Sequence, residues 1–149
     1  MAAGPAPLVL LAAGGTGGHL FPAEALAEAL AKRGFIVDLA TDERATRYGK
    51  AFPARTAHVI PSDTLRGRDP LSLARTAWRL GLGFGQAYAL LGRLRPVAVV
   101  GFGGYPTLPP ILAAAFRRIP TIVHDANAVI GRANAGRMSS SGSGAGISN

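Results

Sequence analysis

Residues 8–21 read LVLLAAGGTGGHLF, an apolar run followed directly by four glycines within five residues. The run from Leu8 to Ala12 predicts a buried strand, and the pattern from Phe21 to Arg33 predicts a helix with Pro22 in its first turn. Glycine lacks a Cβ and tolerates positive φ, so successive N–H groups of the intervening loop can converge on one anion. Because the following helix adds its positive end, Gly14 to His19 predict a site for a phosphate or diphosphate.

Further apolar runs alternate with helical patterns along the chain. Strands are expected at residues 36–41, 57–60, 97–101 and 121–124, and helices at residues 70–94 and 107–118, the second capped by Thr107. Gly81, Gly83 and Gly85 predict a kink or a break in the longer helix. Strands that alternate with helices predict an α/β fold, a Rossmann-like doubly wound parallel sheet that is covered on both faces.

Length and composition predict one ordinary domain with a real core, since the chain has 149 residues of which 48% are hydrophobic. We expect the domain to span residues 1–138 and a disordered Ser/Gly-rich tail to span residues 139–149. Cysteine is absent and the three histidines match no zinc pattern, so neither a metal nor a cofactor is expected. Residues 3–23 and 96–116 are uncharged over the length of a membrane span, but glycine and proline interrupt both, and a cytoplasmic location is expected.

The net charge of +8 is concentrated in the middle of the chain, because residues 64–118 carry eight arginines and one acidic residue, Asp69. Apolar side chains lie between these arginines, which favours binding to an anionic membrane surface over binding to nucleic acid. The predicted membrane patch consists of Arg75, Trp78, Arg79, Leu82 and Phe84. In the alternative interpretation, Trp78 and Phe84 are core residues of a helix that covers the sheet.

Three unusual loops follow predicted strands: Gly14 to His19, residues 101–106 and residues 124–127. In a parallel sheet such loops gather at one edge, where ligands bind at the switch in strand order. Two glycine-rich turns that face one crevice predict a ligand with two phosphates or one large anionic head. His19 lies at the rim of this site, where a neutral imidazole accepts a proton from a reacting hydroxyl.

A dinucleotide-binding domain is the alternative, because Asp38 or Asp42 ends the second strand where a ribose-binding acid would lie. The spacing opposes it: from Gly15, the G-x-G-x-x-G pattern requires a glycine where the chain has Leu20. No Lys-Ser or Lys-Thr pair follows the loop, so the chain also lacks a P-loop. NAD(P) binding remains the less favoured reading.

Three motifs in order carry a resemblance to a known family: AGGTGGHLFPA at residues 13–23, VGFGGYP at 100–106, and HDAN at 124–127 with GRAN at 131–134. From about Leu8 to Asn134 the chain resembles the N-terminal half of the MurG family, transferases that pass GlcNAc from UDP-GlcNAc to lipid I and form lipid II. The resemblance implies a GT-B enzyme with two Rossmann-like domains, of which this chain is the acceptor-binding one and lacks the C-terminal donor-binding one. It also implies a peripheral enzyme at the cytoplasmic face of the inner membrane, and an isolated domain without activity.

The resemblance also implies roles for individual residues. The candidate base is His19, with Asp125 as a weaker candidate. The residues implied to bind the acceptor diphosphate are Gly14, Gly15, Gly103, Gly104 and Tyr105. The residues implied to bind the donor sugar are Thr16, Gly17, Gly18 and Asn127. Asp125 and Ala126 depart from the Glu-Gln pair that is usual in the family's third loop, which removes an amide and shortens a carboxylate. A second hypothesis is a non-catalytic membrane adaptor of a split GT-B enzyme.

Overall fold

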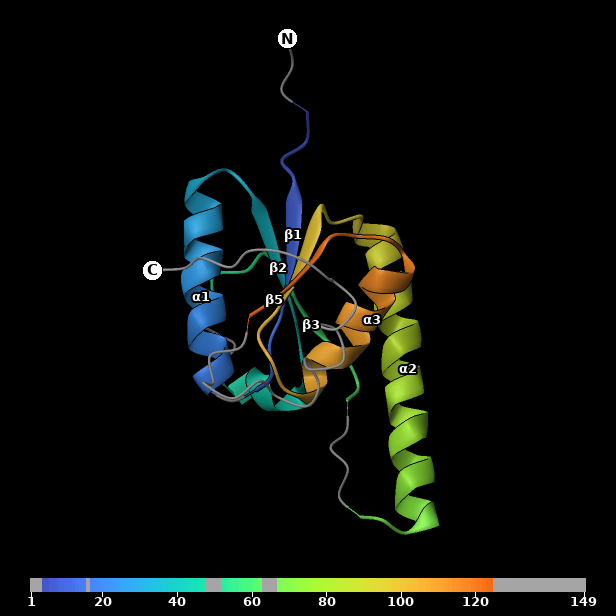
Figure 1. Cartoon of the computed structure of the whole chain (residues 1–149). Helices are drawn as coiled ribbons and strands as arrows, with labels where there is room; N and C mark the ends of the chain where they lie inside the picture. The colour runs from blue at the N-terminus through green and yellow to red at the C-terminus, as the bar shows by residue number, and fades with distance from the viewer. Residues whose placement is uncertain (1–3, 16, 48–51, 63–66, 125–149) are drawn as a thin grey trace, which may run out of the picture.

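The computed structural model describes residues 4–15, 17–47, 52–62 and 67–124, and a parallel five-stranded sheet lies at its centre (Figure 1). The strands are β1 (Leu8–Ala12), β2 (Ile36–Thr41), β3 (Ala57–Val59), β4 (Ala98–Gly101) and β5 (Thr121–Val123). Their order is β3-β2-β1-β4-β5, and all four pairings are parallel. The predicted doubly wound parallel sheet is therefore confirmed, with each of the last three strands one residue shorter than expected.

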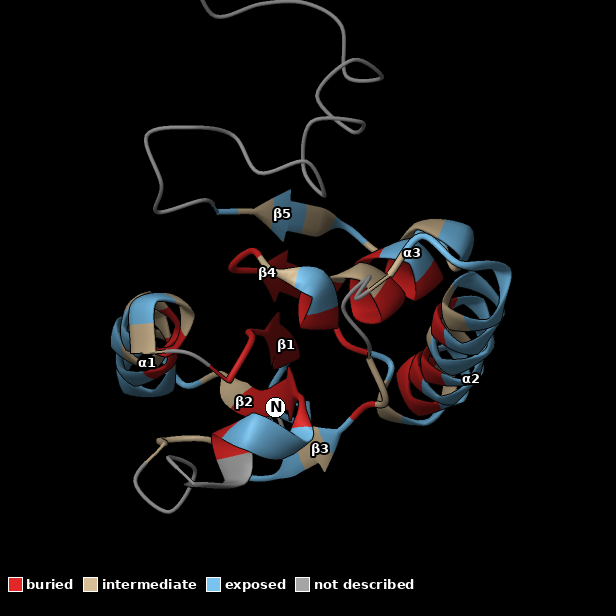
Figure 2. Cartoon of the chain, turned by 90° about the horizontal axis from the view of Figure 1, so that it is seen from below, coloured by how far each residue is buried: buried red, intermediate tan, exposed pale blue. Residues whose placement is uncertain are grey.

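Helices cover both faces of this sheet. The helices are α1 (Gly17–Lys32), α2 (Pro70–Leu94) and α3 (Leu108–Phe116), and two 3₁₀ turns are η1 (Glu43–Arg47) and η2 (Tyr105–Thr107). Figure 2 shows α1 on one face and α2 with α3 on the other, with the buried residues on the helix sides that face the sheet. No helix within the described ranges combines the length and the apolarity that crossing a bilayer requires.

Alternation along β1 divides the core into two parts. Val9 and Leu11 join the cluster beneath α1, whereas Leu10 and Ala12 join the cluster beneath α2 and α3. Successive side chains of a strand point to opposite faces, so a strand that is covered on both sides is apolar throughout. This explains why all five residues of β1 are buried.

Helix α1 begins at Gly17, four residues before the predicted start at Phe21. Pro22 consequently lies inside the helix and not in its first turn. The early start is explained by Leu20, which is buried in the core and anchors the first turn to the sheet. Pro22 has no N–H, so the carbonyl of Gly18 receives no hydrogen bond from the residue four positions later. The glycine loop is thus shorter than predicted, and part of it belongs to the helix.

A kink or a break was predicted at the glycines of α2, and the break is wrong, because the helix runs continuously from Pro70 to Leu94. Asp69 caps it by accepting a hydrogen bond from the Ser72 N–H at 3.0 Å. A Cβ on Gly83 would overlap the carbonyl oxygen of Pro61, whereas Cβ atoms on Gly81 and Gly85 would meet nothing within 4 Å. Packing of the buried helix face outweighs the roughly 1 kcal/mol that each glycine costs a helix.

The predicted side-chain cap at the start of α3 is also wrong. Thr107 occupies the N-cap position, but it makes no side-chain hydrogen bond to the helix. Its Oγ1 instead donates to the carbonyl oxygen of Gly104 at 2.7 Å, because η2 turns the chain immediately before α3. The hydroxyl therefore stabilises the glycine turn and not the helix.

Candidate functional site

The loops after β1 and β4 meet at the carboxyl edge of the sheet. β1 lies between β2 and β4, so the chain order switches beside it, and the loops that leave β1 and β4 diverge there. They nevertheless remain in contact, since a Cβ on Gly14 would lie 3.6 Å from Cγ of Pro106. The structure thus brings together the first two predicted loops.

His19 lies between these two loops. It is the third residue of α1 and is half-buried. A Cβ on Gly14 would lie 3.7 Å from His19 Cδ2, and a Cβ on Gly104 would lie 3.7 Å from both Cδ2 and Nε2. The imidazole therefore lies against both glycine loops, with Nε2 on the side of Gly104. Its Nδ1 is buried and has no hydrogen-bond partner within the described part of the chain.

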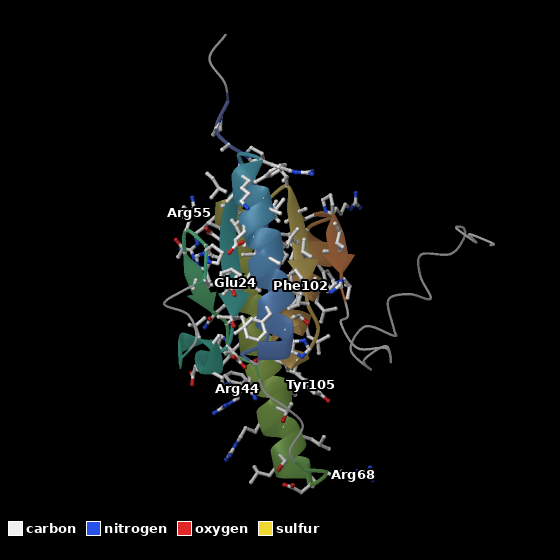
Figure 3. All side chains as sticks on the ribbon, turned by 90° about the vertical axis from the view of Figure 1, so that its left-hand side faces the viewer. Glu24, Arg44, Arg55, Arg68, Phe102 and Tyr105 are labelled. Carbon is white, nitrogen blue, oxygen red and sulfur yellow. The ribbon has the colours of Figure 1, made fainter. Side chains whose placement is uncertain are left out.

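The second loop requires glycine for its backbone conformation. Gly103 has φ 89° and Gly104 has φ 83°, values at which a Cβ is strained. Thr107 fixes the turn through its N–H and Oγ1, both of which donate to the Gly104 carbonyl. Tyr105 follows with 42% of its side chain exposed, and Figure 3 shows it and Arg44 on either side of the start of α1. A ligand at the positive end of α1 can therefore reach Tyr105.

The glycines of the first loop have different surroundings. Gly14 and Gly15 are buried, and a Cβ on Gly15 would lie 2.5 Å from Asp42 Oδ1 and 2.7 Å from the Ala45 nitrogen. Gly15 therefore permits close packing of η1 against the loop. Gly18, in contrast, is exposed, and a Cβ there would meet no described atom within 4 Å. Of these glycines, Gly18 offers the most accessible backbone to a ligand.

Asp42 and Arg44 form an ion pair at the rim of this site that the sequence analysis missed. Arg44 Nε and Nη2 each lie 2.8 Å from Asp42 Oδ2. The Asp42 side chain is 8% exposed, and its Oδ1 is buried without a partner among the described residues. The sequence signal for this pair is an Asp-x-Arg directly after a strand, where Asp42 alone suggested a ribose-binding acid.

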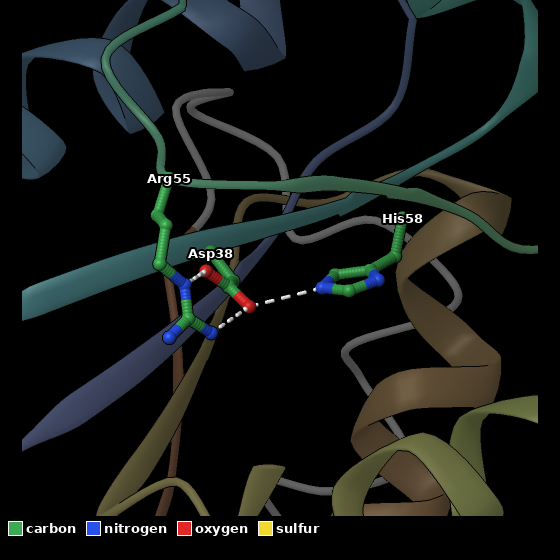
Figure 4. A network of polar contacts seen from close by, with 3 residues as sticks. All are labelled: Asp38, Arg55 and His58. Carbon is green, nitrogen blue, oxygen red and sulfur yellow. Dashed lines mark hydrogen bonds and ion pairs between the residues drawn. The ribbon is translucent and has the colours of Figure 1, made fainter.

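Asp38, the other acid considered for ribose binding, is used inside the protein. Both of its oxygens accept hydrogen bonds: Oδ1 from Arg55 Nε at 3.0 Å, and Oδ2 from Arg55 Nη2 at 2.8 Å and from His58 Nε2 at 2.9 Å (Figure 4). Burial by itself raises the pKa of Asp38, but the hydrogen bonds and positive charges of Arg55 and His58 outweigh it, and the pKa is lowered. Asp38 is therefore a structural carboxylate, and the dinucleotide interpretation loses that ribose ligand.

The third predicted loop is described only at His124. Its N–H donates to the Gly101 carbonyl at 2.7 Å, and its ring meets Phe102 edge to face with centroids 5.6 Å apart. The beginning of this loop thus adjoins the loop after β4. Thr16, Asp125 and Asn127 lie outside the described residues, as does the predicted tail.

The predicted membrane patch lies on α2, whose first turns project beyond the carboxyl edge of the sheet (Figure 1). Trp78 is 69% exposed, and Arg75 and Leu82 are also exposed on the same helix. Trp78 is therefore a surface residue and not part of the core. Phe84 differs, because it is half-buried, packs against the core cluster and meets the ring of Phe116 edge to face at 5.5 Å. It faces α3 and lies apart from the other members of the patch.

Comparison with known proteins links this architecture to glycosyltransferases. The sequence model of a family described as glycosyltransferase family 28 N-terminal domain matches residues 9–138. A UDP-N-acetylglucosamine--N-acetylmuramyl-(pentapeptide) pyrophosphoryl-undecaprenol N-acetylglucosamine transferase from Rhodopseudomonas palustris is 64% identical over 129 residues, which cover 87% of this chain and 35% of that protein. A relative of the same name from a Bradyrhizobium strain is 60% identical over the same shares.

Solved structures give the same result. The crystal structure of MurG from Acinetobacter baumannii matches with a TM-score of 0.71 and 31% identity, over 87% of this chain and 38% of that one. The calicheamicin glycosyltransferase CalG4 matches with a TM-score of 0.61 over 85% of this chain and 34% of that one, but at 20% identity it shows the fold alone. The chain spans about a third of the length of these relatives. The family expected from the three motifs is confirmed.

Proposed function

This chain belongs to glycosyltransferase family 28, whose N-terminal domain it matches, and on that premise we propose that it forms the acceptor-binding side of a GlcNAc transferase. The proposed donor is UDP-GlcNAc, the acceptor is lipid I and the product is lipid II. The observation that carries the proposal is the place of His19 between two glycine loops at the switch point of the sheet. The printed name of the relatives at 64% identity supports the choice of substrates.

The acceptor diphosphate is proposed to bind at the positive end of α1. The first N–H groups of a helix have no partner within it and attract anions. Gly18 is open to a ligand there, and Gly104 and Tyr105 lie on the other side of His19. Gly14, Gly15 and Gly103 are buried, so their proposed role is to form the floor of the site. Thr16, Gly17, Gly18 and Asn127 remain the proposed contacts to the donor sugar.

The proposed reaction is an inverting displacement. The hydroxyl oxygen of the acceptor sugar attacks the anomeric carbon, a new C–O bond forms, and the bond from that carbon to the UDP oxygen breaks. The proton of the hydroxyl passes to His19, and a base in this position contributes about 10² to 10⁴ in rate. Nε2 is the nitrogen proposed to accept it, since Nε2 lies on the side of Gly104. Asp125 remains the alternative base.

The surface formed by Arg75, Trp78, Arg79 and Leu82 is proposed to bind the anionic cytoplasmic face of the inner membrane. A lipid-linked acceptor is met at a bilayer, and the patch lies on α2, whose first turns project past the edge where the acceptor is proposed to bind (Figure 1). Exposed aromatic and aliphatic side chains enter the interface while neighbouring arginines bind anionic headgroups. Such a surface makes the protein peripheral.

The transferase proposal is tested with a chimaera that joins residues 1–138 to the remainder of the Rhodopseudomonas palustris relative. We expect it to transfer labelled GlcNAc to lipid I. Gly18→Ala in the chimaera is expected to lower turnover. This variant should keep the fold, because the new methyl group enters open space in the unliganded protein. A polypeptide of residues 1–149 alone is expected to show no turnover. A folded chimaera that forms no lipid II while the parent relative does would refute the proposal.

The membrane proposal is tested by sedimentation with vesicles that contain phosphatidylglycerol. We expect the double variant Trp78→Ser/Arg79→Ser to bind less and to remain folded. Phe21→Ser/Arg33→Ser is the matched control, because Phe21 is as exposed as Trp78, at 69%, but lies on α1. Equal loss in both double variants would show that the binding is not specific to α2.

A further inference from the structure

A pocket of about 290 Å³ lies between the end of α2 and the end of α3. It is at the amino edge of the sheet, on the side opposite the glycine loops. Figure 1 shows both helices ending at this edge. The residues that line the pocket are Leu91, Gly92, Arg95, Pro96, Arg117 and Ile119. Its volume suits a small ligand or a headgroup.

The surroundings of this pocket are strongly positive. The sequence from residue 70 to residue 124 contains six arginines and no acidic residue. Four of the six, Arg93, Arg95, Arg117 and Arg118, lie in or just after the last turns of α2 and α3. None of the ion pairs within the described ranges includes any of them. The arginines that the sequence suggested as one basic region therefore separate into two groups, of which this one is distant from Trp78.

Arg117 is held in place in the pocket. Its Nε donates to the carbonyl oxygen of Tyr88 at 2.8 Å, and its Cζ lies 3.9 Å from the centre of the Tyr88 ring. A Cβ on Gly92 would lie 2.5 Å from Arg117 Nη2, so glycine at this position lets the guanidinium lie across α2. This hydrogen bond uses Nε and not the terminal nitrogens Nη1 and Nη2. A fixed arginine loses little conformational freedom when it binds a ligand.

Arg95 occupies a position where a side chain is disfavoured. It has φ 47° and ψ 55° at the C-cap of α2, in the left-handed region where glycine is usual. Helix α1 ends in the usual way, with Lys32 in its last turn and Gly34 at φ 85°. At this helix end the basic residue and the left-handed residue are different ones, so the positive charge meets the negative end of the helix dipole without backbone strain. Arg118, which follows α3, has a similar φ of 58° without lining the pocket, so the conformation by itself does not mark the site, and what distinguishes Arg95 is its place in the pocket lining.

We propose that this pocket binds a phosphate group between Arg95 and Arg117. Guanidinium groups form paired, charge-assisted hydrogen bonds with phosphate oxygens, and two of them neutralise a dianion. Leu91, Pro96 and Ile119 complete the lining beside the two guanidinium groups. The phosphate is either a free ion or the headgroup of an anionic lipid, and the site does not depend on the transferase activity.

The test is a titration of the 149-residue chain with inorganic phosphate at constant ionic strength, followed by the arginine Nε–H resonances in NMR spectra. Arg95→Gly removes the side chain and relieves the strained φ, so the variant is expected to fold. Arg118→Gly is the matched control, because Arg118 has φ 58° and carries the same charge but does not line the pocket. We expect Arg95→Gly to weaken binding about tenfold or more, as loss of a charge-assisted pair does, and Arg118→Gly to keep it.

Vesicles of phosphatidylglycerol, compared with neutral vesicles, provide the second arm and separate the two sources of phosphate. Saturable binding of inorganic phosphate that depends on Arg95 supports a site for the free ion. Vesicle binding that depends on Arg95 but not on Arg118, without binding of inorganic phosphate, supports a headgroup site. The proposal is overturned if phosphate acts no differently from chloride and vesicle binding ignores Arg95→Gly, or if the two glycine variants lose binding equally.

Discussion

Three of the four glycines of α2 provide a sharp test of how this helix packs. Gly81, Gly83 and Gly85 lie on one continuous helix, so replacing each by alanine changes helix propensity in the same way. Their surroundings differ, because a Cβ at Gly83 would overlap the Pro61 carbonyl oxygen and lie 3.2 Å from Pro109 Cγ, while the other two positions are open. The same substitution is therefore expected to have opposite effects on stability within a stretch of five residues.

The magnitudes follow from two terms. Alanine stabilises a helix interior by about 0.5–1 kcal/mol relative to glycine, which is the full expected effect of Gly81→Ala and Gly85→Ala. At Gly83 the added methyl group overpacks a contact with backbone, which costs about 3 kcal/mol, at the upper end of the usual range. The net destabilisation by Gly83→Ala is then about 2 kcal/mol, equivalent to a fall in Tm of roughly 4–8 °C for a domain of this size.

The assay is urea denaturation followed by far-UV circular dichroism, because the single tryptophan, Trp78, is exposed and a poor reporter of core packing. Equal m-values would show that the variants unfold from the same compact state. If Gly83→Ala were as stable as Gly81→Ala, α2 would not approach the Pro61 segment through residue 83. Close packing at residue 83 would then not be the reason that this helix tolerates glycine.

Two further predictions concern the sheet and the glycine turn. The lowered pKa of Asp38, whose ordinary value is 3.8, means that its ion pairs stabilise the fold above that pH and are lost as the pH falls through the folded-state pKa. Asp38→Asn should therefore lower the free energy of unfolding by about 1–3 kcal/mol at pH 7, and by progressively less below about pH 4, as measured by urea denaturation. A loss of stability that persisted into strong acid would contradict this. Gly104→Ala should destabilise by about 1–3 kcal/mol, because φ 83° with ψ 165° is a conformation that almost only glycine adopts. Gly18→Ala, in open space, should not destabilise, and equal Tm values for the two variants would contradict this.

Much of the fold could be predicted because its signals are local. The apolar run of β1 has the observed bounds, and the alternation of strands with helices gave the parallel sheet. The convergence of the first two loops followed from topology, since the carboxyl ends of parallel strands share one edge. Errors arose where contacts between distant segments decided the outcome: Leu20 started α1 early, and the packing of α2 kept its glycines helical.

The location of the candidate site could be predicted from the sequence, but the packing of its individual residues could not. The sequence by itself predicted a glycine-rich anion site with His19 at its rim, and three motifs identified the family, because both signals are read from consecutive residues. Only the tertiary structure decided that Gly15 packs under Asp42 while Gly18 stays open, and that Phe84 turns toward α3 away from Trp78. It alone placed Arg95 and Arg117, 22 positions apart in sequence, in one pocket. Neighbours along a chain fix backbone conformation and period, but which atoms meet across elements depends on the packing of the whole domain.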